Sequence, residues 1–496
     1  MRQGPWRPSA AAGLFLALLL VSYLWCATAG TWRHWHTFSN DESVQATAFL
    51  HGKLSLPIQP PAALLALSDP YDKNARRAAK VHEAAPFIHD LAFYKRKFYL
   101  PWGPVPALVT AAVAFVVGQR EPDWGDQYLV FAFTLGTMIL AIWLLREVRR
   151  RFFPQFSPWA DLPPLLSLGL SAPVFWIVSR GAVYEAGISG GQFFLLAGFC
   201  CAWMALARPR PHAGWLALAA SCWALSMGSR ISFPPAVMGI AIVTAFYLWR
   251  RRAALGVYVA LFLPVVMGGG LMGYFNFARF HSFTEFGVRY QLSGTGQSKP
   301  LASGYFSGAN VLPNVVVYLI APPKWGGESP FLHAVKAERW LPKSLWPASD
   351  YKNEEVVGLL WTQPFVFVAI AALLWRWPKA AAVEISEAGE TAEADRALRK
   401  WLIASVAVFG ALAAGPVLVS EFSTMRYLFD VTPCLTILAA IAYCRVMNGM
   451  SAKEGRIAGV VIYAVVIAQI LLAGLLVIDL RAGASAAEGA IPIQGL

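Results

Sequence analysis

Charged residues are scarce in this sequence. They make up 14% of its 496 residues, whereas 57% of the residues are hydrophobic. The few charges lie in short runs between long apolar stretches, which excludes an ordinary soluble globular protein and predicts many membrane spans of roughly 20 residues each. The formal net charge of +13 does not indicate a nucleic-acid partner, because Lys and Arg stand at the ends of apolar segments and form no basic domain.

Cysteine is also rare, and the motifs of several cofactor sites are missing. The six cysteines lie in or beside apolar stretches without a C-x-x-C motif, so we interpret them as small core residues. This pattern argues against a disulfide framework and against a zinc site. The sequence also has no P-loop, no G-x-G-x-x-G after a strand and no H-E-x-x-H. A mechanism that uses a nucleotide in the cytoplasm is therefore not expected.

Apolar stretches long enough to cross a bilayer are, in contrast, abundant. The first follows Arg2 and Arg7 and ends at Ala27-Thr28-Ala29, which resembles a signal peptide. Its apolar run of about 20 residues is longer than the usual core of such a peptide, so we expect an uncleaved first span. The predicted spans are 10–29, 129–145, 161–178, 188–206, 213–228, 234–249, 254–275, 356–375, 401–419, 432–444 and 457–478.

One further apolar stretch, 103–118, decides the topology. It is only about 16 residues long and carries Pro104 and Pro106 near its start, as expected for a juxtamembrane or re-entrant helix. If it does not cross and the N-terminus is cytoplasmic, Arg clusters such as 149–151 and 250–252 all face the cytoplasm. The positive charges therefore predict about eleven spans in a bacterial inner membrane, with the N-terminus cytoplasmic and the C-terminus periplasmic.

This topology gives a single transmembrane domain over residues 1–496, and the predicted fold class is an all-α polytopic membrane protein. Two long periplasmic loops are expected. The first, 30–128, includes surface and re-entrant helices, and the second covers 277–355. The polar, Ala-rich segment 379–400 is expected to be a flexible cytoplasmic linker.

The first candidate site opens the first periplasmic loop. Asp41 and Glu42 follow Ser39 and Asn40 directly after span one, and Ser39 to Glu42 has the spacing of a capping box. In the simplest interpretation the two acids only complement the N-terminus of a surface helix. In the functional interpretation a carboxylate is held at the membrane surface as a general base.

Two further candidates lie along the same face. His89 and Asp90 precede a stretch of aromatics and prolines and could join a substrate or metal site, although the aromatics alone could be interfacial anchors. Arg180, Tyr184 and Glu185 occupy a short outer turn, where charges at membrane depth are costly and tend to be functional or paired. A purely structural Arg180–Glu185 pair is an equal alternative.

The last candidates stand where two later spans meet the periplasm. Arg279, Glu285 and Arg289 are interleaved with aromatic residues, a pattern that could bind a phosphate headgroup or a sugar face. Arg426 and Tyr427 lie in a short outer turn, and an Arg there could stabilise a phosphate leaving group. For both groups, ordinary anchoring to lipid headgroups stays open.

Acids, arginines and aromatics thus collect in nearly every outer turn, whereas the inner turns are Arg clusters, and this asymmetry predicts a site that faces outward. With its acidic pair opening a long outer loop after an N-in span, the sequence resembles the GT-C class of membrane glycosyltransferases. It is similar to the branch that holds protein O-mannosyltransferases and lipid A aminoarabinose transferases. The stretches that look like bacterial members are Lys97–Ala107, Arg180–Glu185, Asn276–Leu292 and Arg426–Asp430.

The resemblance implies a hexosyl- or pentosyltransferase that moves a sugar from a polyprenyl-phosphate donor, with inversion, to a periplasmic lipid, glycan or protein. By position, Asp41 matches the catalytic acid of the class, Glu42 is its neighbour and Arg426 is a candidate for the phosphate. Some members bind a divalent metal, but no ligand set in this sequence is specific enough to assign one.

Two alternatives from other classes stay open, a lipid-linked glycan transporter or flippase and a noncatalytic envelope assembly protein. A transporter should carry ionisable residues in mid-span and often inverted repeats. The predicted spans here are nearly free of charge, and no repeat is evident. These features favour the enzyme.

Overall fold

The computed structural model describes residues 10–85, 88–292, 306–327, 329–346, 351–375 and 390–488. Within them, six helices are long and apolar enough to cross a membrane, or seven if one bent pair is counted as a span. The chain is a helical, polytopic membrane protein, as predicted. The six long helices are α1 (Ala10–Ala27), α7 (Asp126–Phe152), α10 (Val183–Leu206), α13 (Leu255–Phe280), α18 (Glu390–Val419) and α20 (Ala452–Glu488).

The bent pair breaks where a proline interrupts an apolar run. The short helix η2 (Pro158–Asp161) leads into α8 (Leu162–Gly169), and α9 (Ala172–Arg180) follows at an angle of 52°. Pro173 stands in the first turn of α9, where its missing N–H is tolerated. At the break, the carbonyl of Gly169 accepts a hydrogen bond from the buried Tyr23 hydroxyl of α1 at 2.9 Å.

Shorter helices complete the bundle. Each predicted span overlaps one helix or the bent pair, except 356–375, which starts in a short strand and covers two helices separated at Gln363. How many of these helices cross the membrane stays a prediction. The shorter helices are α11 (Ala213–Ser229), α12 (Pro234–Arg250), α15 (Leu359–Thr362), α16 (Pro364–Trp375) and α19 (Thr432–Asn448).

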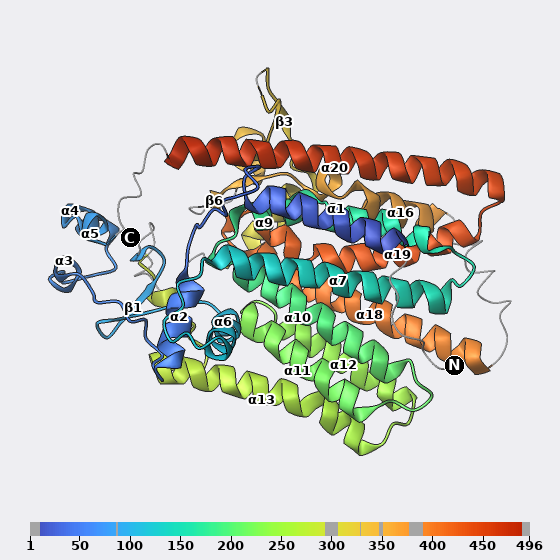
Figure 1. Ribbon diagram of the computed structural model, residues 1–496, viewed down its shortest axis with the longest axis horizontal. Coiled ribbons are helices and arrows are strands. Elements are labelled where there is room, and N and C mark those ends of the chain that lie inside the picture. The colour runs from blue at the N-terminus through green and yellow to red at the C-terminus, as the bar shows by residue number, and fades with distance from the viewer. Residues whose placement is uncertain are drawn as a thin grey trace.

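The turns between these helices gather at two opposite ends of the bundle (Figure 1). At one end, which we call the arginine end, Arg151 pairs with Asp395 at 2.7 Å and donates to the carbonyl of Ala207 at 2.7 Å. Arg149 pairs with Asp161 there at 2.9 Å. The expected cytoplasmic Arg clusters therefore lie together.

The other end, the site end, carries the two long loops and their small elements (Figure 1). Among the described residues of this end, four two-stranded sheets form: three are antiparallel (β1–β2, β3–β4 and β5–β7), and β6–β8 is parallel. The first loop contains α2 (Asp41–Leu50), α3 (Ala62–Leu65), α4 (Lys73–Ala78), α5 (Val81–Ala84), β1 (Ala92–Tyr94), β2 (Lys97–Tyr99) and α6 (Val105–Val116). The second loop and the turn before α19 contain η3 (Val288–Tyr290), η5 (Gly308–Asn310), α14 (Val311–Ile320), β3 (Lys324–Trp325), β4 (Leu332–His333), β5 (Val335–Lys336), η6 (Ala337–Arg339), η7 (Lys343–Leu345), β6 (Lys352–Asn353), β7 (Glu355–Val356), β8 (Phe422–Ser423) and η8 (Met425–Asp430).

Helix α6, the apolar stretch that decides the topology, begins and ends at the site end. Before it, the carbonyl of Leu100 accepts a hydrogen bond from Arg279 at 2.7 Å. After it, Asp123 accepts one from Asn40 at 2.7 Å. Because both flanks are held at the same end, α6 does not join the two ends of the bundle. The side of a membrane that each end faces stays a prediction.

The expected linker 379–400 differs from the structure in its second half. Residues 379–389 lie outside the described part, but from Glu390 onward the segment is the first part of helix α18. Ala, Glu, Arg and Lys are among the strongest helix formers, so a polar composition alone did not justify a flexible segment here. The Asp395–Arg151 pair fixes this extension against α7.

Candidate functional site at one end of the bundle

The N-terminus of α2 is held by an acid that lies far along the chain. The Asp126 carboxylate accepts hydrogen bonds from the Ser39 hydroxyl at 2.5 Å, from the Asp41 N–H at 3.2 Å and from the Glu42 N–H at 3.1 Å. The predicted capping box between Ser39 and Glu42 is therefore wrong, because Asp126 rather than the Ser39 side chain accepts the Glu42 N–H. Ser39 instead accepts the N–H of Val183 at 2.9 Å, which ties α2 to the start of α10.

Asp41 and Glu42 are adjacent but lie in different environments. The Asp41 side chain is partly exposed, and its carboxylate makes no hydrogen bond or ion pair within the described residues. Burial raises the pKa of Asp41 to about 6. Glu42 is 1% exposed, and within the described residues no side chain pairs with its carboxylate. Burial, together with the nearby Asp126 and Asp41, raises the pKa of Glu42 well above its ordinary value, so Glu42 favours its neutral form.

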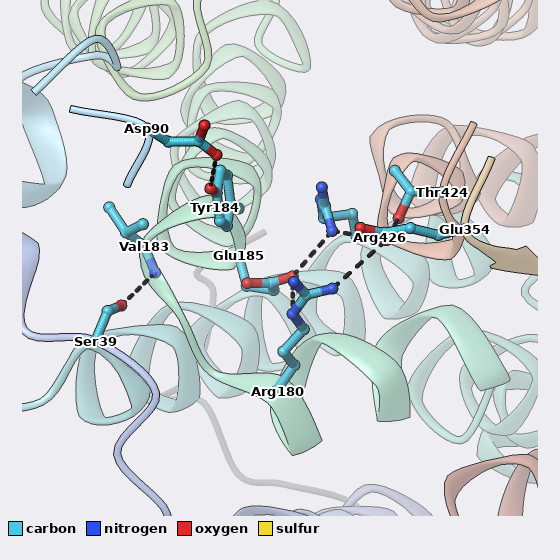
Figure 2. A network of polar contacts seen from close by, with 9 residues as sticks. All are labelled: Ser39, Asp90, Arg180, Val183, Tyr184, Glu185, Glu354, Thr424 and Arg426. Atoms are coloured by element: carbon cyan, nitrogen blue, oxygen red, sulfur yellow. Dashed lines mark hydrogen bonds and ion pairs between the residues drawn. The ribbon is translucent and has the colours of Figure 1, made fainter. Parts of the chain in front are cut away.

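A second cluster joins two arginines and two glutamates from three parts of the chain. Figure 2 shows Arg426 between Glu185 and Glu354, with Arg180 approaching the same two carboxylates. Arg426 lies 3.0 Å from Glu354 and 3.9 Å from Glu185. Arg180 lies 3.5 Å from Glu354 and 3.8 Å from Glu185. The structural Arg180–Glu185 pair is thus present, but as part of a larger network.

Short backbone pairings position this cluster. Strand β6 pairs in parallel with β8, and the N–H of Glu354 donates to the carbonyl of Ser423 at 2.8 Å. This pairing brings Glu354 against Thr424, whose hydroxyl donates to the Glu354 carboxylate at 2.5 Å. Burial alone would raise the pKa of Glu354, but Arg426 and Arg180 outweigh burial and hold that pKa below its ordinary value.

Arg426 is 5% exposed and lies against aromatic rings. Its guanidinium carbon is 5.0 Å from the ring centre of Tyr184 and 5.7 Å from those of Phe422 and Tyr427. Burial disfavours its charge, but Glu354 and Glu185 outweigh that effect and raise the pKa of Arg426 above its ordinary value. Arg426 is therefore charged at any physiological pH.

A second arginine also lies close to the ring of Tyr427. The guanidinium carbon of Arg230 is 5.0 Å from the Tyr427 ring centre, and Arg230 pairs with the fully buried Asp430 at 2.7 Å. Arg230 comes from the turn between α11 and α12, and Asp430 ends η8. Two cations from different turns thus lie within about 6 Å of the centre of one tyrosine ring.

A cavity of about 450 Å³ opens among these residues. Arg230, Arg426 and Lys352 provide its positive charges, and Lys352 lies 3.6 Å from Glu421 on the same wall. Trp102, Tyr184, Phe422 and Tyr427 are among its aromatic residues. The predicted site residues that line the cavity are Asp90, Tyr184, Glu285, Arg426 and Tyr427.

The other predicted site residues do not line this cavity. They are Asp41, Glu42, His89, Arg180, Glu185, Arg279 and Arg289. Arg180 and Glu185 contact Arg426 or its partners, as described above, and His89 lies 3.8 Å from Asp90. Asp90 accepts a short hydrogen bond from the Tyr184 hydroxyl, which connects the first loop to α10.

Arg279 is structural, in contrast to its predicted role in substrate binding. It is 2% exposed and donates to the Leu100 carbonyl at 2.7 Å and to Asn276 at 2.9 Å. Its guanidinium packs on Phe275, with 3.8 Å to the ring centre. Glu285 lines the cavity but also accepts the N–H of Gly287 at 2.7 Å, so it shapes the turn after α13.

Three residues of the site were missed from the sequence. Asp126 opens an apolar span and Arg230 is a lone charge in a short outer turn, and both could have been found because charges at membrane depth are costly. Glu354 has no comparable local signal, since only the β6–β8 pairing brings it to Arg426.

No metal centre is evident in the part of the chain that the structure describes. Within it, His, Cys, Asp and Glu form no group of three or more that could hold an ion. The Asp41, Glu42 and Asp126 carboxyl groups are neighbours, but Asp126 is occupied by three hydrogen-bond donors.

Known proteins provide distant likenesses. No protein-family model and no curated protein matches the sequence. The structure is similar to that of ArnT from Cupriavidus metallidurans bound to undecaprenyl phosphate, with a TM-score of 0.45 and 12% identity over 97% of this chain and 80% of that chain. The apo state of the same ArnT gives a TM-score of 0.39 and 14% identity over 92% and 64% of the two chains.

An oligosaccharyltransferase from Archaeoglobus fulgidus in the apo form is a third likeness. Its TM-score is 0.43 and its identity 11%, over 93% of this chain and 55% of that chain, so this chain spans about half of its length. ArnT and the oligosaccharyltransferase are GT-C glycosyltransferases, the class that the sequence resembles.

Proposed function

We propose that this protein transfers a sugar from a polyprenyl-phosphate donor to a periplasmic lipid, glycan or protein acceptor, with inversion at the sugar carbon. One observation carries the proposal: Arg426 contributes to a cavity wall together with Tyr184, Phe422 and Tyr427. A buried guanidinium fork suits a phosphate, and the rings offer apolar faces to a sugar. A lipid-linked donor also needs no nucleotide site, in agreement with the missing motifs.

The proposed reaction needs one group that acts on the acceptor hydroxyl and one that acts on the departing phosphate. The acceptor oxygen forms a bond to the sugar carbon while the bond between that carbon and the phosphate oxygen breaks. The electron pair of the broken bond leaves with the phosphate, where Arg426 stabilises the added negative charge. The proton of the acceptor hydroxyl passes to a general base, and the products are the glycosylated acceptor and polyprenyl phosphate.

Asp41 is the general base in this proposal. Its carboxylate is partly exposed and has no partner within the described residues, so it is free to accept a proton. Asp41 is two residues, or about 7 Å of backbone at most, from Ser39, which binds the cavity-lining residue Val183. The neighbouring Glu42 is less suitable because it is buried and favours its neutral form.

The test is sugar transfer by the purified protein in lipid nanodiscs, with a panel of undecaprenyl-phosphate sugars and total envelope lipids and glycans as acceptors. Arg426→Lys keeps the charge but loses the fork, so we expect donor turnover to fall by roughly 100-fold. Arg289→Lys is the matched control, because Arg289 does not line the cavity. The transporter is tested in sealed proteoliposomes, where movement of intact donor across the bilayer without release of undecaprenyl phosphate would favour the transporter and contradict the enzyme.

A further inference from the structure

The Glu354 carboxylate occupies a point at which three hydrogen-bond donors converge. A single oxygen, Oε2, lies 3.0 Å from Arg426 Nη1 and 3.5 Å from Arg180 Nη1, and it accepts the Thr424 hydroxyl at 2.5 Å. Figure 2 shows the three donors around this carboxylate. Two guanidinium groups and a hydroxyl on one oxygen are a set of donors that also suits a phosphate oxygen.

The same two arginines have a second carboxylate beside them. Glu185 is fully buried, with 0% exposure, and neither of its oxygens has a hydrogen-bond partner within the described residues. It lies 3.8 Å from Arg180 and 3.9 Å from Arg426. Glu185 therefore remains as a counter-charge for both arginines whether or not Glu354 is present.

The charges of this cluster already balance, so an additional anion would have no counter-charge within it. Arg180 and Arg426 carry two positive charges, and Glu185 and Glu354 carry two negative charges, so the four side chains are neutral together. A phosphate added beside Arg426 would repel both carboxylates at short range in a poorly solvated site. Replacement of the Glu354 carboxylate by the phosphate avoids that repulsion.

We propose that Arg180, Thr424 and Arg426 form an anion site for the phosphate of a lipid-linked substrate, and that Glu354 fills this site until the phosphate displaces it. This inference rests on the proposed function for the identity of the anion. It adds Arg180 and Thr424 to the phosphate ligands. The Glu354 carboxylate then competes with the phosphate for these hydrogen-bond donors.

Displacement of Glu354 requires little rearrangement. Its side chain is 30% exposed, in contrast to the fully buried Glu185, so it can rotate toward solvent. Its backbone directly follows β6 and is held by the hydrogen bond from its N–H to the Ser423 carbonyl of β8 at 2.8 Å, so only the side chain has to move. Glu354 is therefore the one of the two carboxylates that a ligand can move.

The experiment measures binding of undecaprenyl phosphate to the full-length protein in nanodiscs. Glu354→Gln should bind this probe roughly tenfold more tightly, since one charge-assisted interaction no longer competes. Glu355→Gln is the matched control: it removes the same charge from the next residue, whose side chain makes no ion pair among the described residues. Unchanged or weaker binding by Glu354→Gln would overturn the proposal.

A second variant separates displacement from a change in folding. In the Glu354→Gln background, Thr424→Val removes a donor of the anion site and should reverse most of the gain in affinity, with an unchanged melting temperature. Full retention of the gain would contradict the role of Thr424. Inorganic phosphate is the second probe: tighter binding of both probes supports a site for the phosphate group itself, and tighter binding of neither overturns the site.

The two proposals can fail separately. If the protein transfers no sugar but Glu354→Gln still binds phosphate more tightly, the anion site stands and the transferase does not. If the protein transfers sugar but Glu354→Gln binds no more tightly than Glu355→Gln, the transferase stands and Glu354 is only a positioning residue for Arg426.

Discussion

The N–H of Glu42 donates to the Asp126 carboxylate at 3.1 Å across 84 residues of sequence. The first residue of α7 therefore caps the first turn of α2. The Ser39 hydroxyl donates to the same carboxylate and accepts a hydrogen bond from the N–H of Val183. One acid thus positions the candidate base Asp41 relative to α7 and α10, and hence relative to the cavity.

Removal of this cap should loosen the site. Asp126→Ala leaves the Asp41 and Glu42 N–H groups and the Ser39 hydroxyl without an acceptor. We expect a loss of about 0.5–2 kcal/mol in the free energy of unfolding, as for other N-cap deletions. Thermal unfolding in detergent measures it, with Asp123→Ala as control because Asp123 is exposed and accepts from the Asn40 side chain rather than from the backbone of α2. Equal melting temperatures for the two variants would contradict the capping role.

Asp41→Asn should lose activity without losing stability. If Asp41 is the general base, the amide cannot accept the proton, and turnover should fall by roughly 100- to 10,000-fold. Burial raises the pKa of Asp41 from 3.8 to about 6, so the fold disfavours its ionised form. This cost grows as pH rises from about 4 to 6 and is complete above pH 6. The variant should therefore be at least as stable as the wild type at pH 7.5; wild-type turnover by Asp41→Asn would leave Asp41 as a structural residue only.

The same pKa predicts the acid limb of the pH profile. Asp41 accepts a proton only when ionised, so the single-turnover rate should fall as pH drops below about 6. A rate that stays constant from pH 7 down to about pH 5 would be inconsistent with this base. The measurement is made in nanodiscs with saturating donor, so that chemistry rather than binding is followed.

Glu42→Gln should be tolerated. Glu42 is buried with no side-chain partner for its carboxylate among the described residues, and its raised pKa favours the neutral acid. A neutral amide of similar shape therefore changes little, and we expect turnover within roughly threefold of wild type and a shift of less than about 1 kcal/mol in stability. A loss of turnover as large as that of Asp41→Asn would show that Glu42 takes part in proton transfer.

Helix α6 should not cross the membrane. Glu121 follows it at the site end, and Arg150 lies at the arginine end; both are exposed. Single cysteines at Glu121 and Arg150, in a background without the native cysteines, should react with an impermeant thiol reagent from the periplasm and the cytoplasm, respectively. Labelling of both from the same side would reject the predicted topology and the outward-facing site.

The sequence was most informative about individual segments. Long apolar runs predicted helices at every span that the structure contains, because the length of a span and its apolar composition are local properties. The Arg clusters near 149–151 and 250–252 were correctly expected to share one end, since the alternation of spans allows only two ends. The segment from Glu390 was misjudged because its polarity was read without its helix propensity.

The tertiary structure alone decided which polar side chains meet. Arg426 and Arg180 were singled out from their positions at span ends, but their shared partner Glu354 depends on a two-residue strand pairing between distant loops. The cap of α2 by Asp126 depends likewise on how α7 packs beside the first loop. Hydrophobic length and positive charge determine how a chain threads a bilayer, whereas lateral packing of helices determines its contacts, and no local pattern in the sequence encodes that packing.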